Sequence, residues 1–504
     1  IIFIFSFSVN YYYGSIGVFP IDTFAFFDSA NFINKGFLPV RDYWTANGFF
    51  VDILQSFLFK LFGVNWITYL LHSSLLNFFL SFATYKFLIF KGLSLKSSLF
   101  YSVSVSILAY PSSGVPFPDH HSLILSVISL YVLIYSYEKK SNIFFSVSLI
   151  FLFFAFLSKQ TPAGLFIILV AGYVFLYSIS LKNTLFIKNF IITCFVFILL
   201  LIIFLLLSKT GIKNFLIQYI LFPITIGEER SLDLTINSFI SSLLGEFKFF
   251  LVVILIIIFQ LLSKKNKKRF ILDQTNIFFL ILIFISLINQ EIMKNQNMIF
   301  FLLPISFGII HSNHKFFKNL KRKVFIFSVI LLNAFVTLKY HERFNLDRKF
   351  MDLQNIDKSQ YISGEEISKK LKGLKWVSLE NQTYLKDEIL LLKDTIEYLK
   401  KNKDNSIIIS YYQFINSEIE NNIYSPNRWY TDDGVSYPKY GNKYHEYYVN
   451  FYKNKLDEHK VKNIYTILPL DQKTFNFVLK SNCYKSLKIN KLLLKHEILK
   501  CFAN

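Results

Sequence analysis

The stretch IKNFIITCFVFILLLIIFLLL at residues 187–207 decides the fold class of this chain. It reaches the ~20 residues that an α-helix needs to cross the hydrocarbon core of a bilayer, and Lys188 is its one charged residue. No water satisfies backbone N–H and C=O groups in that core, so the segment must form a helix with internal hydrogen bonds. We therefore predict a polytopic α-helical membrane protein.

Similar apolar runs recur along the first two thirds of the chain, and together they predict about eleven spanning helices. The run at 1–13 is too short to span, so we expect the printed sequence to start inside the first span. A cleaved signal peptide is the rival explanation, although no charged segment or small-residue cleavage site is visible. The other runs lie at 65–91, 97–110, 120–137, 142–158, 163–181, 187–207, 246–262, 276–289, 297–311 and 324–338.

The composition supports the membrane class and argues against a nucleic-acid partner. The 504 residues are 53% hydrophobic and 19% aromatic, and the mean hydropathy is +0.42. Such a chain is too apolar to have water as its main solvent. The net charge of +21 would suit nucleic acid, but Lys, Ile, Asn, Phe and Tyr are all abundant together, as AT-rich coding sequences produce. We predict no nucleic-acid partner, and we assign the Lys excess to cytoplasmic loops.

Basic loops set the predicted orientation. If the helices alternate in direction, the most basic loops fall on one side, which is then the cytoplasm. The first loop at 14–64, the later loops on its side and everything after about 340 then face the periplasm, and the protein is placed in the cell inner membrane. The basic residues are Lys139, Lys140, Lys264, Lys265, Lys267, Lys268, Arg269, Lys315, Lys318, Lys321, Arg322 and Lys323.

A soluble α/β domain is predicted for residues 340–504, after a membrane domain at 1–339. Its sequence is charged, rich in Tyr and Asn, and free of spanning runs. Apolar spacing and short apolar runs predict a helix, a strand, a second helix and a second strand. Strands separated by helices indicate a small α/β fold. The predicted elements lie at 387–401, 406–410, 444–459 and 463–468.

Two features of this domain stay open at the level of sequence. The polar, aromatic loop at 425–444 is either a ligand-facing segment or an ordinary structural loop. Cys483 and Cys501 either form a disulfide, which requires a periplasmic domain, or stay free thiols.

The first external loop combines an amphipathic helix with three acids. Residues 50–61 place apolar side chains on one helical face and polar ones on the other, which predicts an interfacial helix. Asp22, Asp28 and Asp42 lie in a loop against the bilayer surface, where acids indicate function. The alternative is that Asp22 caps a helix and that Asp28 and Asp42 are solvated.

The order of residues in this loop resembles that of bacterial GT-C glycosyltransferases. An acid opens a helix, a Gly-x-x-Pro-x-Arg-Asp-Tyr-Trp sequence and a further Gly follow, and an apolar helix then ends in Phe-Gly. The resemblance covers residues 1–165. It is to protein O-mannosyltransferases, the lipid A aminoarabinose transferase and rhizobial-type core glycosyltransferases. The matching residues are Asp22, Gly36, Phe37, Leu38, Pro39, Val40, Arg41, Asp42, Tyr43, Trp44, Gly48, Phe62 and Gly63.

This resemblance implies a GT-C-like fold and a glycosyltransferase. The enzyme would move a sugar from a polyprenyl-phosphate donor to a cell-surface glycan, lipid or protein acceptor at the periplasmic face. Asp22 falls on the position of the family's first-loop acid, the catalytic base or cation-facing carboxylate. Arg41 is expected to bind the donor phosphate. Substrate-binding or structural roles are expected for Asp28, Asp42, Tyr43 and Trp44.

Two later loops on the same side carry further candidates. Asp119 lies where the family often has a second acid, so it could take the acceptor's proton together with Asp22. Lys159 and Gln160 could bind the departing phosphate. The alternatives are that Asp119 caps the following helix and that Lys159 is a snorkelling residue at a helix end. His120 and His121, next to Asp119, are further candidates for binding substrate or holding the site.

A divalent cation, Mg or Mn, is a second possibility at this site. Asp22, Asp119 and His120 would be its ligands. Adjacent residues make a poor chelate, however, and no HxxH spacing is present. We therefore assign no cofactor and keep the divalent cation as an alternative.

A further loop and two other function classes stay open. The loop with Glu228, Glu229, Arg230 and Asp233 either covers the lipid donor or is solvated surface. An inverting, single-displacement transfer is the favoured reaction. A transporter or flippase of lipid-linked saccharides would instead place ionisable residues within spans. The chain departs from many relatives of the resembled family at two places, since these carry Asp-Glu at Asp22-Thr23 and Lys-Gly-Pro at Asn47-Gly48-Phe49. The departure at Thr23 would suit a non-catalytic membrane scaffold.

Overall fold

A computed structural model of the chain describes residues 1–181, 184–262, 274–293, 298–313, 319–379, 381–419, 422–431, 434–467, 479 and 481–499. The chain forms two compact units, each assembled from separate parts of the sequence. Unit 1 comprises Ile1–Tyr13, Leu71–Leu200 and Glu229–Phe350, and unit 2 comprises Gly14–Leu70, Leu201–Glu228 and Met351–Asn504.

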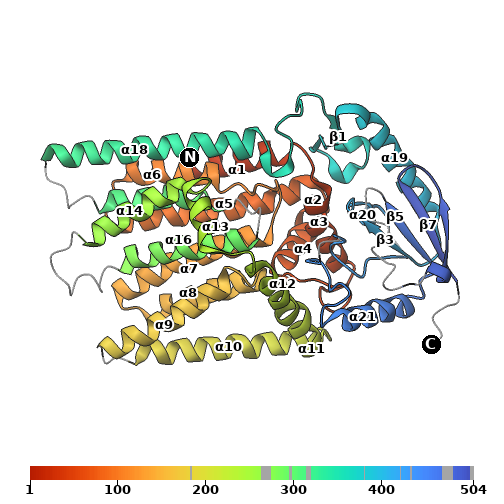
Figure 1. Cartoon of the computed structure of the whole chain (residues 1–504), viewed down its shortest axis with the longest axis horizontal. Helices are drawn as coiled ribbons and strands as arrows, with labels where there is room; N and C mark the ends of the chain where they lie inside the picture. The colour runs from red at the N-terminus through yellow and green to blue at the C-terminus, as the bar shows by residue number, and fades with distance from the viewer. Residues whose placement is uncertain are drawn as a thin grey trace. The chain divides into compact units, whose positions relative to one another are not determined.

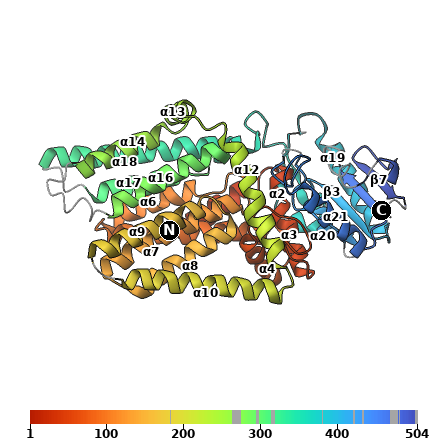
Figure 2. The same ribbon diagram turned by 60° about the horizontal axis from the view of Figure 1, so that its bottom comes forward.

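Unit 1 is built from helices, most of which run side by side in both ribbon views (Figures 1 and 2). All of them except α13 coincide with the predicted apolar runs. With their full bounds, these helices are α1 (Ile2–Gly14), α5 (Trp66–Phe90), α6 (Leu95–Leu108), α7 (Pro118–Lys139), α8 (Asn142–Ser158), α9 (Ala163–Leu181), α10 (Leu185–Leu207), α13 (Ile236–Leu244), α14 (Lys248–Leu262), α16 (Gln274–Met293), α17 (Leu302–Ser312) and α18 (Asn319–His341).

Helix α7 is the most buried of the long helices of this unit. Within its most apolar 18-residue window, 89% of the residues are buried. Several of its serines find partners on the neighbouring helix or within their own turn, since Ser129 donates to the Ser148 carbonyl of α8 at 2.7 Å and Ser126 donates to the Ser122 carbonyl at 2.7 Å. Gly308 of α17 allows a close approach of α5 and α6, because a Cβ there would lie 2.8 Å from a methyl of Leu88 on α5 and 3.4 Å from the Tyr101 ring on α6. The interior of unit 1 is therefore closely packed, and it contains many buried polar side chains, of which several serines are hydrogen-bonded to backbone carbonyls.

Helix α10 shows the opposite pattern and identifies lipid as the solvent. Its apolar window has a mean hydropathy of 3.5, yet only 6% of that window is buried. Leaving so many aliphatic and aromatic side chains in water would forfeit about 25 cal/mol for each Å² of apolar surface. The chain is therefore a membrane protein.

Fewer helices are long enough to span a membrane than the sequence predicts. Among the described residues, five helices are long and apolar enough to cross a membrane, or up to six if α13 and α14, bent by 94°, count as one span. Four further apolar helices are shorter. Helices at the predicted positions are thus present, while the total of about eleven spans stays a prediction. Of the basic residues that set the predicted orientation, Lys264, Lys265, Lys267, Lys268, Arg269, Lys315 and Lys318 lie outside the described residues.

Unit 2 contains a five-stranded sheet with the order β4-β3-β5-β7-β6. Strand β3 pairs in parallel with β4 and β5, and the remaining pairs are antiparallel. A two-stranded sheet joins β1 and β2. The bounds are β1 (Ile362–Ser363), β2 (Lys375–Trp376), α19 (Asn381–Lys401), β3 (Ser406–Ser410), α20 (Ile415–Glu418), β4 (Ile423–Tyr424), α21 (His445–Glu458), β5 (Asn463–Ile467), β6 (Tyr484–Lys488) and β7 (Leu493–Ile498).

The predicted helices and strands of the C-terminal region are confirmed. The helix predicted from residue 387 is α19, which begins earlier, and the helix predicted from residue 444 is α21. The two predicted strands are β3 and β5, whose residues are buried throughout. The antiparallel hairpin β6–β7 was not predicted. Cys483 is a buried free thiol, and Cys501 lies outside the described residues.

The first loop belongs to unit 2 rather than to the helices of unit 1. It joins the C-terminal residues through backbone hydrogen bonds, since Trp44 N–H donates to the Pro426 carbonyl at 2.8 Å and Val18 N–H donates to the Val377 carbonyl at 2.8 Å. The loop forms α2 (Pro20–Thr23), α3 (Ala25–Asn34) and α4 (Phe50–Phe62). The unit also includes α11 (Ile212–Phe215), a π-helix (Leu216–Leu221) and the first part of α12 (Phe222–Ser231). The division into a membrane and a soluble domain at residue 339 stays a prediction.

Candidate functional site

The strongest pairing of predicted site residues lies at the ends of two apolar helices of unit 1. Lys159 Nζ is 2.7 Å from Asp119 Oδ2, and the two side chains are 13% and 6% exposed. Lys159 follows the last residue of α8, and Asp119 lies in the first turn of α7, where the helix dipole favours an anion. The other carboxylate oxygen, Oδ1, is buried without a hydrogen-bond partner among the described residues. Asp119 can therefore accept one more hydrogen bond.

The structure removes both structural alternatives for this pair. The N-cap of α7 is Phe117, so Asp119 does not cap the helix. The ammonium of Lys159 is held by Asp119 and does not snorkel outward. The backbone carbonyl of Lys159 also accepts a hydrogen bond from Ser122 Oγ at 3.2 Å, which ties α7 to the end of α8. Gln160 follows Lys159 and is partly buried.

The two histidines next to Asp119 differ in their surroundings. His121 Nδ1 is 2.8 Å from the Phe117 carbonyl, so Nδ1 carries the hydrogen in the neutral ring. Its Nε2 then accepts from Nε2–H of His72 on α5, at 2.9 Å. His120 packs edge-on against Phe301. Sequence analysis missed His72, because a single histidine inside an apolar run gives no signal until its partner is known.

The described residues do not support the predicted divalent-cation site. Among them, no group of three or more His, Cys, Asp or Glu side chains is arranged to hold a metal ion. The nearest polar partners of Asp119 and His121 are a lysine and a histidine that is already hydrogen-bonded. The Mg or Mn ion therefore stays an alternative, and the proposed reaction does not need it.

Asp22 lies in α2 of unit 2, on a backbone that is fixed on both sides. The Ile21 carbonyl accepts a hydrogen bond from Trp429 Nε1 at 3.0 Å, and the Thr23 carbonyl accepts one from Tyr69 Oη at 3.1 Å. The interpretation of Asp22 as a helix cap is wrong, because the N-caps of α2 and α3 are Phe19 and Phe24. Thr23 itself accepts the Phe19 N–H at 2.9 Å through its hydroxyl. That hydrogen bond gives Thr23 a structural role where many relatives of the resembled family carry Glu.

Asp28 is buried rather than solvated, with 3% of its surface exposed. Its Oδ2 accepts a hydrogen bond from Asn416 Nδ2 at 2.7 Å, and its Oδ1 is buried without a hydrogen-bond partner among the described residues. Burial raises the pKa of this carboxyl to about 8, against the opposing effect of the Asn416 hydrogen bond. Asp28 is therefore mostly protonated at neutral pH.

Arg41 and Asp42 bind each other instead of facing solvent. Arg41 donates from Nε to Asp42 Oδ2 at 2.8 Å, and its two other nitrogens donate to the Ser208 and Gly36 carbonyls at 3.0 and 2.6 Å. Asp42 also receives the Leu38 N–H at 2.7 Å. The prediction that Asp42 is solvated is therefore wrong, and Arg41 holds the loop with every one of its nitrogens.

Tyr43 and Trp44 contact other side chains inside unit 2 and have structural roles. Tyr43 Oη is 2.6 Å from Ser29 Oγ, and Trp44 is completely buried. The Trp44 ring lies 4.9 Å from the Tyr448 ring in an edge-to-face arrangement, inside a core cluster that also includes Phe222. These side chains attach the first loop to α21 and to the start of α12.

A buried ion pair between Asp52 and Arg428 is the feature of unit 2 that sequence analysis missed. Asp52 Oδ2 is 2.6 Å from an Arg428 guanidinium nitrogen, and the side chains are 0% and 1% exposed. The guanidinium carbon lies 5.1 Å from the Phe26 ring, 5.4 Å from the Trp429 ring and 5.9 Å from the Tyr43 ring. In the sequence, Asp52 lies on the polar face of the interfacial helix predicted at 50–61. The partner that makes it internal is more than 370 positions away.

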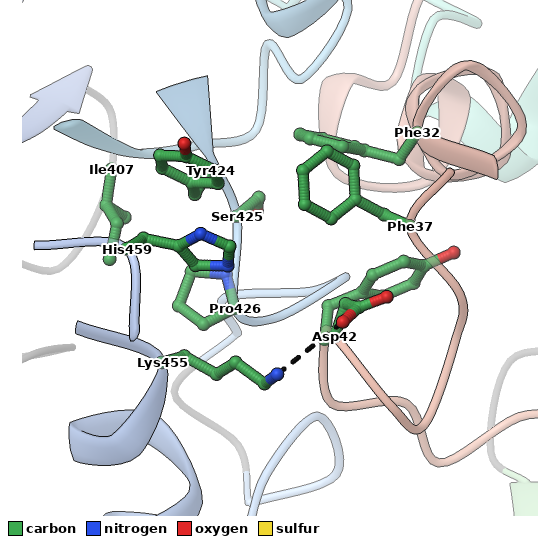
Figure 3. A pocket seen from close by; sticks show the side chains of 10 residues that line it. Phe32, Phe37, Asp42, Ile407, Tyr424, Ser425, Pro426, Lys455 and His459 are labelled. Carbon is green, nitrogen blue, oxygen red and sulfur yellow. Dashed lines mark hydrogen bonds and ion pairs between the residues drawn. The ribbon is translucent and has the colours of Figure 1, made fainter. Parts of the chain in front are cut away.

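A small open pocket in unit 2 lies between the first loop and the sheet (Figure 3). It is small, with free space for about one water molecule. Asp42 and Lys455 lie at one side, and the rings of Phe37, Tyr424 and His459 form much of the wall. The full lining is Phe32, Phe37, Asp42, Tyr43, Ile407, Tyr424, Ser425, Pro426, Lys455 and His459.

The charged residues from 228 to 233 are mostly at the surface of the protein. Arg230 is partly buried and contacts Met293 Sδ at 3.6 Å, and Asp233 is exposed. Glu228 and Glu229 lie in the last turns of α12. The predicted role of this loop as a cover for the lipid donor stays a prediction.

Comparisons with known proteins identify no family. No family model matches the chain, and no curated protein matches it. Among solved structures, an oligosaccharyltransferase from Archaeoglobus fulgidus in complex with Zn and sulfate is 11% identical, with a TM-score of 0.45. The alignment covers 93% of this chain and 68% of that one. The archaeal oligosaccharyltransferase AglB of the same organism, in complex with an inhibitory peptide and a dolichol-phosphate, is 9% identical with a TM-score of 0.47, over 95% and 70% of the two chains. Likenesses of this size leave the chemistry of this chain to its own residues.

Proposed function

We propose that the chain is a membrane glycosyltransferase. It transfers a sugar from a polyprenyl-phosphate donor to a surface glycan, lipid or protein acceptor at the periplasmic face. The observation that carries the proposal is the Asp119–Lys159 pair, an acid and a cation held almost out of water at the ends of two apolar helices. Charges in that setting are costly unless they act on a substrate or on each other.

Each member of the pair suits one part of the reaction. The acceptor hydroxyl loses its proton to a carboxylate while its oxygen attacks the anomeric carbon of the donor. The bond from that carbon to the phosphate oxygen breaks, and both electrons leave with the polyprenyl phosphate. Configuration at the anomeric carbon inverts. Atoms and charges balance without a covalent enzyme intermediate.

Asp119 and Lys159 divide the work in this proposal. The unpartnered Oδ1 of Asp119 accepts the hydrogen bond of the acceptor hydroxyl. Lys159 turns from Asp119 toward the leaving phosphate and stabilises its charge in a site with little water. Asp22 is proposed as a second carboxylate because of its place in the first-loop pattern, and its fixed backbone would keep its side chain in one position.

The experiment is deletion of the gene in its host, followed by complementation and mass spectrometry of the surface glycans. The variants are Asp119→Asn, Lys159→Met and Asp22→Asn, and the control is Asp394→Asn, which neutralises an exposed acid on α19. We expect wild type and the control to restore one missing sugar. The three site variants should lose about 10²–10³ in transfer rate.

Amounts of each variant in the membrane, measured by immunoblot, separate loss of chemistry from loss of folding. Lys159→Arg adds a second test, because it keeps the charge and should retain more activity than Lys159→Met. Full restoration of the glycan by Asp119→Asn would show that Asp119 is not needed for transfer, and the proposal would then be wrong.

A further inference from the structure

Helix α13 of unit 1 is short and amphipathic, and most of its apolar surface is exposed. Ile236, Ile240 and Leu244 follow one another at intervals of four residues and are 79%, 46% and 61% exposed. Residues at this spacing lie on the same side of an α-helix. Phe239 and Leu243, beside this face, pack against the core of unit 1. Part of α13 therefore holds it to the unit, while the rest presents aliphatic side chains to the surroundings.

Helix α13 lies crosswise to the helix that follows it. The two axes are bent by 94° between Leu244 and Lys248. Helix α14 packs against α16 and α17, and α13 lies at the outer edge of the unit (Figure 2). The hydroxyls of Thr235 and Ser238 cap the start of α13 reciprocally, so it is a helix in its own right. Its nine residues, at right angles to α14, add nothing to the length with which α14 can cross a membrane.

The corner between α13 and α14 lies at the end of unit 1 where α7 begins. Tyr340 Oη, near the end of α18, donates to the Glu246 carbonyl in this corner at 3.2 Å. The Tyr340 ring stacks on Phe300, with centroids 3.7 Å apart. The next residue, Phe301, contacts the ring of His120 in the first turn of α7. The corner is thus at the same end of the unit as the candidate acid and cation.

Two lysines without an acidic partner lie at this corner. The ammonium nitrogens of Lys248 and Lys339 are 6.0 and 4.9 Å from the centroid of the Phe249 ring. Neither lysine forms an ion pair with any residue that the structure describes, whereas Arg343 pairs with Glu246. The charges of Lys248 and Arg343 both repel that of Lys339. An anion at the corner would therefore meet two positive charges that no carboxylate balances.

A lipid surface matches both properties of the corner. Leu255 and Phe259 of α14 are more than half exposed, so lipid covers α14, and the apolar face of α13 continues that surface. A helix of this kind buries its apolar face at the boundary between head groups and acyl chains. Lysines at that level attract the phosphates of anionic lipids. Water would instead leave the aliphatic face of α13 unburied.

We propose that the α13–α14 corner is a binding surface for anionic phospholipid. Helix α13 lies in the plane of the leaflet, with Ile236, Ile240 and Leu244 among the upper parts of the acyl chains. Lys248 and Lys339 bind the phosphodiester head groups. The surface is independent of the proposed transferase, since it uses none of the residues assigned to that reaction. It fixes the depth of this end of unit 1 at the level of the head groups.

The first test measures the depth of α13 by electron paramagnetic resonance. The full chain, with its three cysteines replaced, carries a nitroxide at Ile240→Cys in nanodiscs that contain phosphatidylcholine and phosphatidylglycerol. Collisions with oxygen should exceed those with a water-soluble nickel chelate, because oxygen concentrates among acyl chains and the chelate does not. Asn237→Cys, an exposed polar position of the same helix, is the control and should show the reverse order.

Two outcomes of this measurement would overturn the proposal. More collisions with the nickel chelate than with oxygen at Ile240→Cys would place the face in water. Few collisions with either reagent would mean that protein covers α13, such as a second copy of this chain.

The second test measures lipid binding by native mass spectrometry of the full-length protein in detergent. Phosphatidylglycerol should bind more tightly than phosphatidylcholine. In the double variant Lys248→Gln with Lys339→Gln, the affinity for phosphatidylglycerol should fall about fivefold for each lysine removed. The double variant Lys248→Arg with Lys339→Arg keeps both charges and should bind as wild type does, which excludes misfolding as the cause of the loss.

The matched control is Lys369→Gln with Lys372→Gln, which removes the same charge from exposed positions of unit 2. Its affinity for phosphatidylglycerol should equal that of wild type. Equal affinities in the two Gln double variants would overturn the surface. Polyprenyl phosphate is the last probe, and lysine-dependent binding of it that is tighter than that of phosphatidylglycerol would make the corner a donor site instead of a phospholipid surface.

Discussion

Folding buries the carboxyl group of Asp28, so the free energy of unfolding should depend on pH through this group. Because its pKa in the folded protein is raised to about 8, its contribution to stability is complete below the pKa of the unfolded chain and is lost as the pH rises through 8. Between pH 6 and pH 9 we expect the free energy of unfolding to fall by about 2–3 kcal/mol through this group alone.

Asp28→Asn isolates this effect. The amide keeps the shape and the hydrogen bond with Asn416, by reorienting one of the two groups, but it cannot ionise. Thermal unfolding of the detergent-solubilised protein at several pH values should show a flatter profile for the variant, which should be the more stable form at pH 9. Parallel profiles for the two proteins would mean that Asp28 titrates normally.

The buried pair of Asp52 and Arg428 should be far more important for stability than an exposed pair. Arg428→Met leaves the carboxylate of Asp52 buried without a counter-charge, which we expect to cost about 3–5 kcal/mol. The double variant Asp52→Leu with Arg428→Met should cost less than the sum of the single changes, because both charges leave together. Denaturant titration measures these differences.

The exposed pair Arg343–Glu246 is the control for this cycle. Its atoms are 3.0 Å apart, but its side chains are 27% and 36% exposed. Arg343→Met should cost about 1 kcal/mol or less. Additive costs for Asp52 and Arg428 would show that the two charges do not depend on each other.

Candidate site residues could be named from the sequence where a local motif contained them. Asp119 was named because the resembled family often has an acid there, and Lys159 because it ends a helix on the same side; the structure pairs them, which the sequence did not predict. The burial of Asp28, Asp42 and Asp52 was not predictable, because their partners Asn416, Lys455 and Arg428 lie 388, 413 and 376 positions away. Short-range periodicity contains no information about such pairs.

Among the helices, α4 has most of its polar residues inside and several of its apolar residues outside. Asp52 and Gln55 are fully buried, whereas Phe57, Leu61 and Phe62 are 56%, 57% and 58% exposed. The amphipathic pattern was correctly identified from the sequence, but periodicity alone does not say which face meets the protein. The Asp52–Arg428 pair explains why the polar face turns inward. The exposed face then suits the apolar side of a membrane interface.

Tryptophan scanning with brominated lipids tests the position of α4. Leu61→Trp should add emission that brominated phospholipids quench, whereas Leu58→Trp, at a position 6% exposed, should add emission that they quench much less. The wild-type protein supplies the background from the native tryptophans. Equal quenching at both positions would mean that the exposed face of α4 does not meet lipid.

For the chain as a whole, the sequence predicted the helical class well, because bilayer thickness and backbone hydrogen bonding allow few solutions. It separated the first loop from the C-terminal region, whereas the structure places both in unit 2. The bonds that join them, such as Trp44 N–H to the Pro426 carbonyl, involve backbone groups that any residue supplies. No side-chain pattern could have indicated them.

The proposed reaction depends on which side of the membrane each loop of the chain faces. Helix α7 spans 22 residues, so Asp119 and Lys140 lie at its opposite ends. In a background without the three cysteines, we introduce Tyr440→Cys, in the C-terminal region, and Lys140→Cys. A membrane-impermeant maleimide should label Tyr440→Cys in spheroplasts and should label Lys140→Cys only after lysis, because the positive-inside rule places the Lys139–Lys140 loop in the cytoplasm. The reverse order would place the Asp119–Lys159 pair on the cytoplasmic side. A donor flipped to the periplasm would then never reach it, and the transferase would need a donor on the cytoplasmic face.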